Sequence, residues 1–163
     1  MSGPVFPHLT EAGQARMVDV SAKEVTARTA TAAGRVLLSA ECVAALRDGT
    51  VPKGDALAVA RIAGIQGAKR TSELIPLCHP LFLSGVDVTA EVSDEGVELT
   101  ATVRTNERTG VEMEALTAVT TAALTVVDMI KAVDRAAVIT DVRVLAKSGG
   151  RRGEWQRNED GNP

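Results

Sequence analysis

The sequence predicts an α+β fold, in which helices cover one face of an antiparallel β-sheet. Residues 110–132 carry apolar side chains at three- and four-residue spacing, with no Pro and no Gly after position 110, as in a long helix. Residues 86–93 and 97–103 alternate apolar and polar side chains around a turn at 94–96, which is typical of a hairpin with one solvated face. Aromatic residues are only 2% of the 163, so small side chains must fill the core and bring helices close to the sheet.

The first part of the chain contributes strands and a short helix. Residues 25–38 alternate weakly and then become apolar, so we expect two strands joined at Gly34. Ser39 is a favourable N-cap for a helix over residues 40–47. Gly49 stands where a residue in the left-handed conformation would end that helix.

A second long helix is expected over residues 56–75, before Pro76. Gly64 and Gly67 each cost about 1 kcal/mol relative to Ala inside a helix. Close packing against another backbone would compensate for this cost, and the alternative is simply a weak helix.

A last strand is expected at residues 138–145, where apolar residues alternate again. The resulting order β-α-β-β-α-β is that of a split, ferredoxin-like fold, here with an extra N-terminal strand or hairpin. The length fits one domain, which we place at residues 16–153, with a flexible arm at 1–15 and a flexible tail at 154–163.

Composition and charge exclude several classes of protein. The net charge of −3 gives no general attraction to nucleic acid or to an anionic membrane. No apolar run approaches about 18 residues and no signal peptide precedes the domain, so we expect no membrane span and a cytoplasmic protein. Cys42, Cys78, His8 and His79 are too few and too scattered for a Cys/His metal site, so we expect no metal ligands.

Asp128 and Lys131 lie on one face of the long helix, near its end. They could form an ordinary surface ion pair, worth about 0.2–0.5 kcal/mol. The apolar neighbours Val127 and Met129 instead favour partial burial, which would make the lysine a candidate acid or base. Both interpretations stay open on position alone.

Two loops carry further candidate residues. His79 lies between Pro76 and Pro80, which restrict its backbone, so it is either a structural histidine or a positioned catalytic one. The neighbouring Cys78 reads as a small buried hydrophobe. Residues 147–153 combine glycines with three cations, as in a phosphate-binding loop or a basic disordered tail, although the spacing is not that of a Walker loop.

Seven further motifs stand out in the sequence. They are 17–23 (MVDVSAK), 53–55 (KGD), 60–66 (ARIAGIQ), 68–70 (AKR), 74–81 (LIPLCHPL), 109–118 (TGVEMEALTA) and 145–150 (LAKSGG). Together they resemble the molybdenum cofactor biosynthesis protein C family, the cyclic pyranopterin monophosphate synthases. The similarity extends from about residue 8 to residue 153.

The resemblance implies a lyase that converts 3′,8-cyclo-7,8-dihydroguanosine 5′-triphosphate into cyclic pyranopterin monophosphate and pyrophosphate. It implies no redox cofactor, and leaves open whether Mg²⁺ accompanies the triphosphate. It also implies a homohexamer, a trimer of dimers, with each pocket at a dimer interface. The pocket residues that it implies are Asp128, Lys131, Lys53 and His79 as catalytic groups, and Cys78, Glu112, Met113, Glu114, Lys147 and, by spacing alone, Arg28 as substrate-binding groups.

Within this hypothesis Lys131, tuned by Asp128, is our choice for the general acid or base, with His79 as a second. Lys53 and Lys147, joined by Arg151 and Arg152, would neutralise the triphosphate despite the negative net charge. The alternative is a non-catalytic ferredoxin-like module that binds a nucleotide or pterin without turnover.

Overall fold

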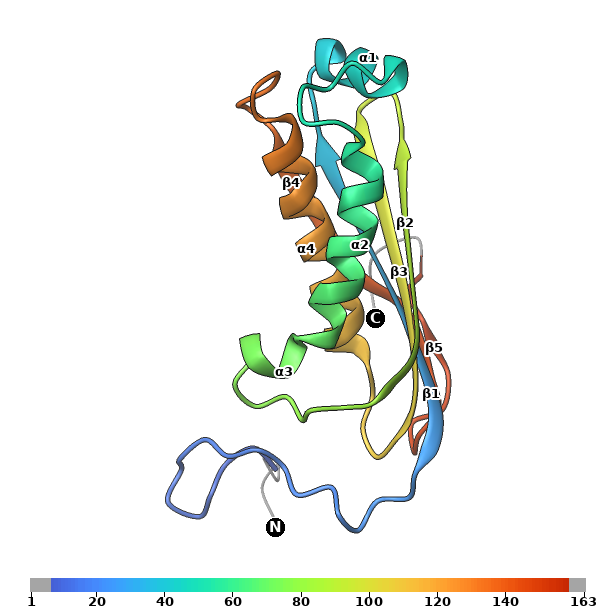
Figure 1. Cartoon of the computed structure of the whole chain (residues 1–163). Coiled ribbons are helices and arrows are strands. Elements are labelled where there is room, and N and C mark those ends of the chain that lie inside the picture. Colours follow the sequence, from blue (N-terminus) through green and yellow to red (C-terminus); the bar gives the residue numbers. More distant parts are fainter. Residues whose placement is uncertain (1–6, 159–163) are drawn as a thin grey trace.

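The computed structural model describes residues 7–158 and contains one antiparallel sheet in the strand order β2-β3-β1-β4-β5 (Figure 1). Helices α2 and α4 lie side by side along one face of this sheet (Figure 1). The split, ferredoxin-like fold is confirmed, because β1-α2-β2-β3-α4-β4 with sheet order β2-β3-β1-β4 is that topology. The elements are β1 (Thr26–Leu37), α1 (Ala40–Asp48), α2 (Ala56–Lys69), α3 (Thr71–Leu74), β2 (Leu83–Val92), β3 (Gly96–Glu107), α4 (Glu112–Ile130), β4 (Val138–Ser148) and β5 (Trp155–Gln156).

The predicted break at Gly34 is wrong, because β1 is one continuous strand and there is no extra N-terminal strand before it within the described residues. A Cβ atom at Gly34 would lie 2.7 Å from Cγ1 of Val119 on α4. Glycine is therefore needed for the close approach of helix and sheet, and not for a turn. The additional strand is β5, at the other end of the chain.

Both expected terminal segments contain some regular pairing. Leu9 and Ala15 form an isolated antiparallel bridge, and β5 lies inside the segment expected to be a tail. Residues 1–6 and 159–163 of these segments lie outside the described part of the chain.

The second helix is shorter than predicted, because α2 ends at Lys69 and a separate short helix, α3, follows. The hydroxyl of Thr71 donates a hydrogen bond to the Ala68 carbonyl over 2.9 Å, and this side chain is buried. The bond satisfies a carbonyl at the end of α2 where the regular helical bonds stop.

The close packing predicted from the helical glycines is confirmed. A Cβ atom at Gly64 would lie 3.0 Å from the Ala118 carbonyl oxygen, and one at Gly67 would lie 2.7 Å from Cβ of Thr121. Any larger side chain at either position would push α2 away from α4.

Helix α4 forms the centre of the core. It is long and apolar enough to cross a membrane by length and composition alone, although its sequence was expected to hold no such run. Its Ala115, Ala118, Ala122 and Val126 are completely buried among the core side chains, so its apolar character is explained by packing within this fold.

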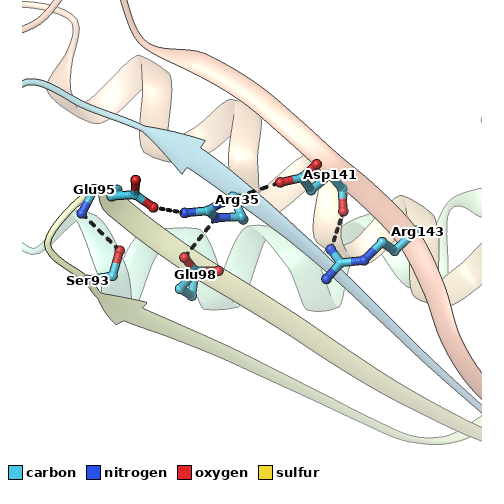
Figure 2. A network of polar contacts seen from close by, with 6 residues as sticks. All are labelled: Arg35, Ser93, Glu95, Glu98, Asp141 and Arg143. Carbon is cyan, nitrogen blue, oxygen red and sulfur yellow. Dashed lines mark hydrogen bonds and ion pairs between the residues drawn. The ribbon is translucent and has the colours of Figure 1, made fainter. Parts of the chain in front are cut away.

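A polar network holds the central strand to its neighbours on the face of the sheet opposite α4. Arg35 of β1 donates to Glu98 of β3 over 2.9 Å and to Asp141 of β4 over 3.5 Å, and it also pairs with Glu95 (Figure 2). Asp141 has a φ of 56°, beside the place where the β1–β4 pairing shifts register. Arg35 therefore links three strands across this irregularity.

Candidate active site

The first group of predicted residues meets at the C-terminal end of α4. Lys53, in the loop before α2, places its Nζ atom 2.9 Å from Oδ2 of Asp128. Lys131 places its Nζ atom 2.8 Å from Oδ1 of the same carboxylate. Hydrogen bonds from Lys131, which has the larger effect, and from Lys53 lower the pKa of Asp128 to about 2. Asp128 is thus a permanent anion that holds two ammonium groups in place.

This group is exposed in the single chain, so of the two interpretations left open for Asp128 and Lys131 the surface ion pair is the one observed there. Their side chains are 55% and 60% exposed. The reason is the helical period: Val126 and Ile130 face the core, and Asp128 lies between them on another side of α4.

The second group lies at the N-terminal end of the same helix. Nζ of Lys147, on β4, is 2.6 Å from Oε1 of Glu112 in the first turn of α4, and both side chains are about one-third exposed. A cavity of about 500 Å³ surrounds this pair. The cations that line the cavity are Lys23, Arg28, Lys147, Arg151 and Arg152.

This first cavity has the chemistry of an anion site. Five cationic side chains face a single carboxylate, so the local charge is opposite to the net charge of the chain. Gly149, with a φ of 90°, lines this cavity, and Gly150, with a φ of 74°, continues the turn of the backbone. Charged donors around a polar hollow are suited to phosphate groups.

A second cavity, of about 570 Å³, shares Glu112 and Lys23 with the first and is lined by Cys78 and by Glu114. Glu114 is only 4% exposed, and burial raises its pKa to about 7, with the charge of Glu112 adding to the effect. Burial also raises the pKa of the Cys78 thiol, as does the nearby Glu114. Cys78 is therefore no activated nucleophile, whereas Glu114 can carry a proton near neutral pH.

His79 and Met113 also line this second cavity. The Nε2 atom of His79 lies 2.7 Å from the carbonyl oxygen of Val18. Because a carbonyl can only accept, Nε2 carries a proton and donates it, which leaves Nδ1 to exchange a proton elsewhere. The segment before β1 thus orients the histidine of the proline-bounded loop.

The structure divides the predicted site residues between the two ends of α4. Glu112 and Asp128 are more than four helical turns apart, about 24 Å along the axis. Lys53 and Lys131 join Asp128, and the other predicted residues gather around the two cavities near Glu112. No group of three or more His, Cys, Asp or Glu side chains that could hold a metal occurs among residues 7–158.

Sequence reasoning missed two contributors. Lys23 lines both cavities, and so does His8 from the segment expected to be an arm. Lys23 is the last residue of the 17–23 motif, and its place in that motif could have marked it as a site residue. No pattern in the sequence marks His8.

Comparison with known proteins shows the same family over most of the chain. The model of the MoaC family matches residues 17–150. A Streptomyces coelicolor protein named cyclic pyranopterin monophosphate synthase is 69% identical over 151 residues, which are 93% of this chain and 89% of the relative. A Peptoclostridium acidaminophilum protein with the same name is 50% identical over 152 residues, 93% of this chain and 97% of the relative. The chain therefore belongs to the MoaC family.

Proposed function

We propose that this protein is a cyclic pyranopterin monophosphate synthase, a lyase of molybdenum cofactor biosynthesis. The observation that carries the proposal is 65–69% identity, over more than nine-tenths of the chain, to three relatives that bear this name. The substrate would be 3′,8-cyclo-7,8-dihydroguanosine 5′-triphosphate, and the products cyclic pyranopterin monophosphate and pyrophosphate. Its substrate derives from GTP, so we place the reaction in the cytoplasm.

The cationic cavity is suited to the triphosphate. Closing the cyclic phosphate forms a P–O bond at the α-phosphorus and breaks the α–β anhydride, so pyrophosphate leaves with its negative charge. Lys147, Arg28 and Lys23 can stabilise that charge, with Arg151 and Arg152 at the rim. The attacking hydroxyl must also lose a proton to a base.

The remaining groups can supply the proton transfers of the ring rearrangement. Lys131 is our candidate general acid or base, held by Asp128 together with Lys53. Glu114 borders the second cavity and can exchange a proton near neutral pH, and His79, which borders the same cavity, is our second candidate acid or base. No redox cofactor enters this scheme, and Mg²⁺ could accompany the triphosphate.

The group around Asp128 and the group around Glu112 can act on one substrate only if two chains share a site. Catalytic groups act within hydrogen-bond reach, about 3 Å, whereas these groups lie at opposite ends of α4. In a dimer the Asp128 group of one protomer could meet the Glu112 group of its partner. The exposed Val59, Ile62 and Leu124 on the outer sides of α2 and α4 offer apolar surface for such contacts. We propose a hexamer made of three such dimers.

The test is to incubate the purified protein with the cyclised GTP intermediate and to measure pyrophosphate and an oxidisable pterin product. Formation of both is expected. Binding of the intermediate without either product would favour the alternative, a non-catalytic ferredoxin-like module that binds nucleotides or pterins.

A further inference from the structure

The chain continues past the stretch that matches the MoaC family and returns to the sheet. The match ends at residue 150, yet β5 pairs antiparallel with β4, so that Trp155 lies opposite Lys147 and Gln156 opposite Ala146. Residues 149–154 are therefore the loop of a hairpin and not a free basic tail.

Three contacts fasten the end of this hairpin. The backbone N–H of Arg157 donates to the Leu145 carbonyl over 2.7 Å. Its Nε atom donates to the Val144 carbonyl over 2.8 Å. Its guanidinium carbon lies 5.6 Å from the ring centroid of the half-buried Trp155, in a cation–π contact. Trp155 and Arg157 thus contact each other, and both are bonded to β4.

The loop of the hairpin packs directly against Arg28 of β1. A Cβ atom at Gly149 would lie 3.2 Å from Cα of Arg28, and one at Gly150 would lie 3.0 Å from its Cζ atom. The N–H of Gly153 donates to the Gly150 carbonyl over 3.2 Å and closes the turn. The two glycines therefore allow the hairpin to lie directly against a cation of the first cavity.

Trp155 also borders the functional groups themselves. A third cavity, of about 490 Å³, is lined by Trp155 and Glu154 together with Lys147, Arg152 and Glu112. Arg152 and Lys147 face the first cavity as well. The indole therefore packs where strand, loop and anion site meet.

We propose that Trp155 and Arg157 are positioning residues that fix the hairpin, so that Lys147 and Arg152 are preorganised for the diphosphate end of the substrate. Neither residue touches reacting atoms. Without them the loop would have to be ordered each time a phosphate binds, which weakens binding and leaves the chemical step unchanged. The proposal rests on the proposed function, because it deepens the assignment of that cavity.

The experiment compares Trp155→Ala and Arg157→Ala with two controls in the full-length protein. Trp155→Phe keeps an aromatic ring, and Arg143→Ala removes the same charge from β4 at a residue that lines none of the three cavities. Affinity for inorganic pyrophosphate is measured by calorimetry, and KM and kcat are measured with the cyclised intermediate. Circular dichroism verifies the fold of each variant.

Both alanine variants should bind pyrophosphate about tenfold more weakly and raise KM by a similar factor, with kcat within about twofold of wild type. Trp155→Phe and Arg143→Ala should behave as wild type. Unchanged pyrophosphate affinity in Arg157→Ala, or a fall in kcat at constant KM, would overturn the proposal. Should Trp155→Ala fail to fold, Arg157→Ala still decides. Absence of turnover in the wild type would defeat the proposed function, yet the pyrophosphate comparison would still test the hairpin.

Discussion

Lys147 donates to Glu112 across 2.6 Å, and this bond ties the end of β4 to the first turn of α4. A phosphate that enters the cavity must therefore share this ammonium with a carboxylate already in place. The pair is positioned before any substrate arrives.

Replacing Lys147 with Ala should weaken substrate binding through the phosphates. We expect KM to rise about tenfold or more at low salt, and the difference from wild type to shrink as salt screens the cavity. Steady-state kinetics at several ionic strengths measures both effects. An unchanged KM at low salt would mean that Lys147 does not contact the phosphates.

Replacing Lys131 with Ala should reduce kcat by at least about a hundredfold, the usual contribution of a general acid or base. The fold should survive, because the side chain is 60% exposed and leaves no buried partner unpaired. Arg47→Ala, which removes a cation from the exposed Arg47–Asp94 ion pair and from none of the candidate site residues, is the control. A wild-type rate in Lys131→Ala would remove this residue from the mechanism.

Glu114 should make the protein less stable as pH rises from about 4.5 to about 7. Burial raises its pKa from 4.5 to about 7, so in this window the native chain keeps a proton that the unfolded chain has lost. The loss is at most about 3 kcal/mol and is complete above pH 7. Urea denaturation at pH 5 and pH 8 measures it. Glu114→Gln should lose this contribution, and an identical pH dependence in that variant contradicts the assignment.

Turnover should not depend on zinc. The part of the chain that the structure describes, residues 7–158, has no group of three potential ligands. Treatment with a zinc-selective chelator should leave the rate unchanged, with Mg²⁺ held constant. Inactivation that added zinc reverses would refute this expectation.

Mixed oligomers should reveal whether two chains share each site. Lys131→Ala and Lys147→Ala, unfolded and reassembled together, should give more activity than the two variants reassembled separately, at substrate concentrations near the wild-type KM. The reason is that a mixed dimer holds one site with neither substitution. Lys131→Ala with Lys53→Ala should give no such gain, since both residues hold the same Asp128. No gain in the first mixture, although mass spectrometry shows mixed oligomers, would rule out this division.

The sequence predicted correctly those elements whose formation depends on residues close together in the chain. The period of α4, the hairpin β2–β3 and the Ser39 and Gly49 caps of α1 follow from neighbouring residues, and all are confirmed. The continuity of β1 at Gly34 could not be predicted, because the reason is a contact with Val119 far along the chain.

The candidate site, too, could be predicted from the sequence only in part. The resemblance to the family suggested the candidate residues, and the structure brings two of them, Lys53 and Asp128, into contact. They could not predict that the two groups lie at opposite ends of α4, nor that Lys23 and His8 line the cavities. Nor could they predict the raised pKa of Glu114, since burial depends on the whole fold.

The central place of β1 determines when this protein can fold during synthesis. Among residues 7–158, β1 is the first strand to be synthesised, and it pairs with β3 on one edge and with β4 on the other. Until β4 (Val138–Ser148) has emerged, β1 keeps an open edge that could pair with another nascent chain. Such long-range pairing also slows folding.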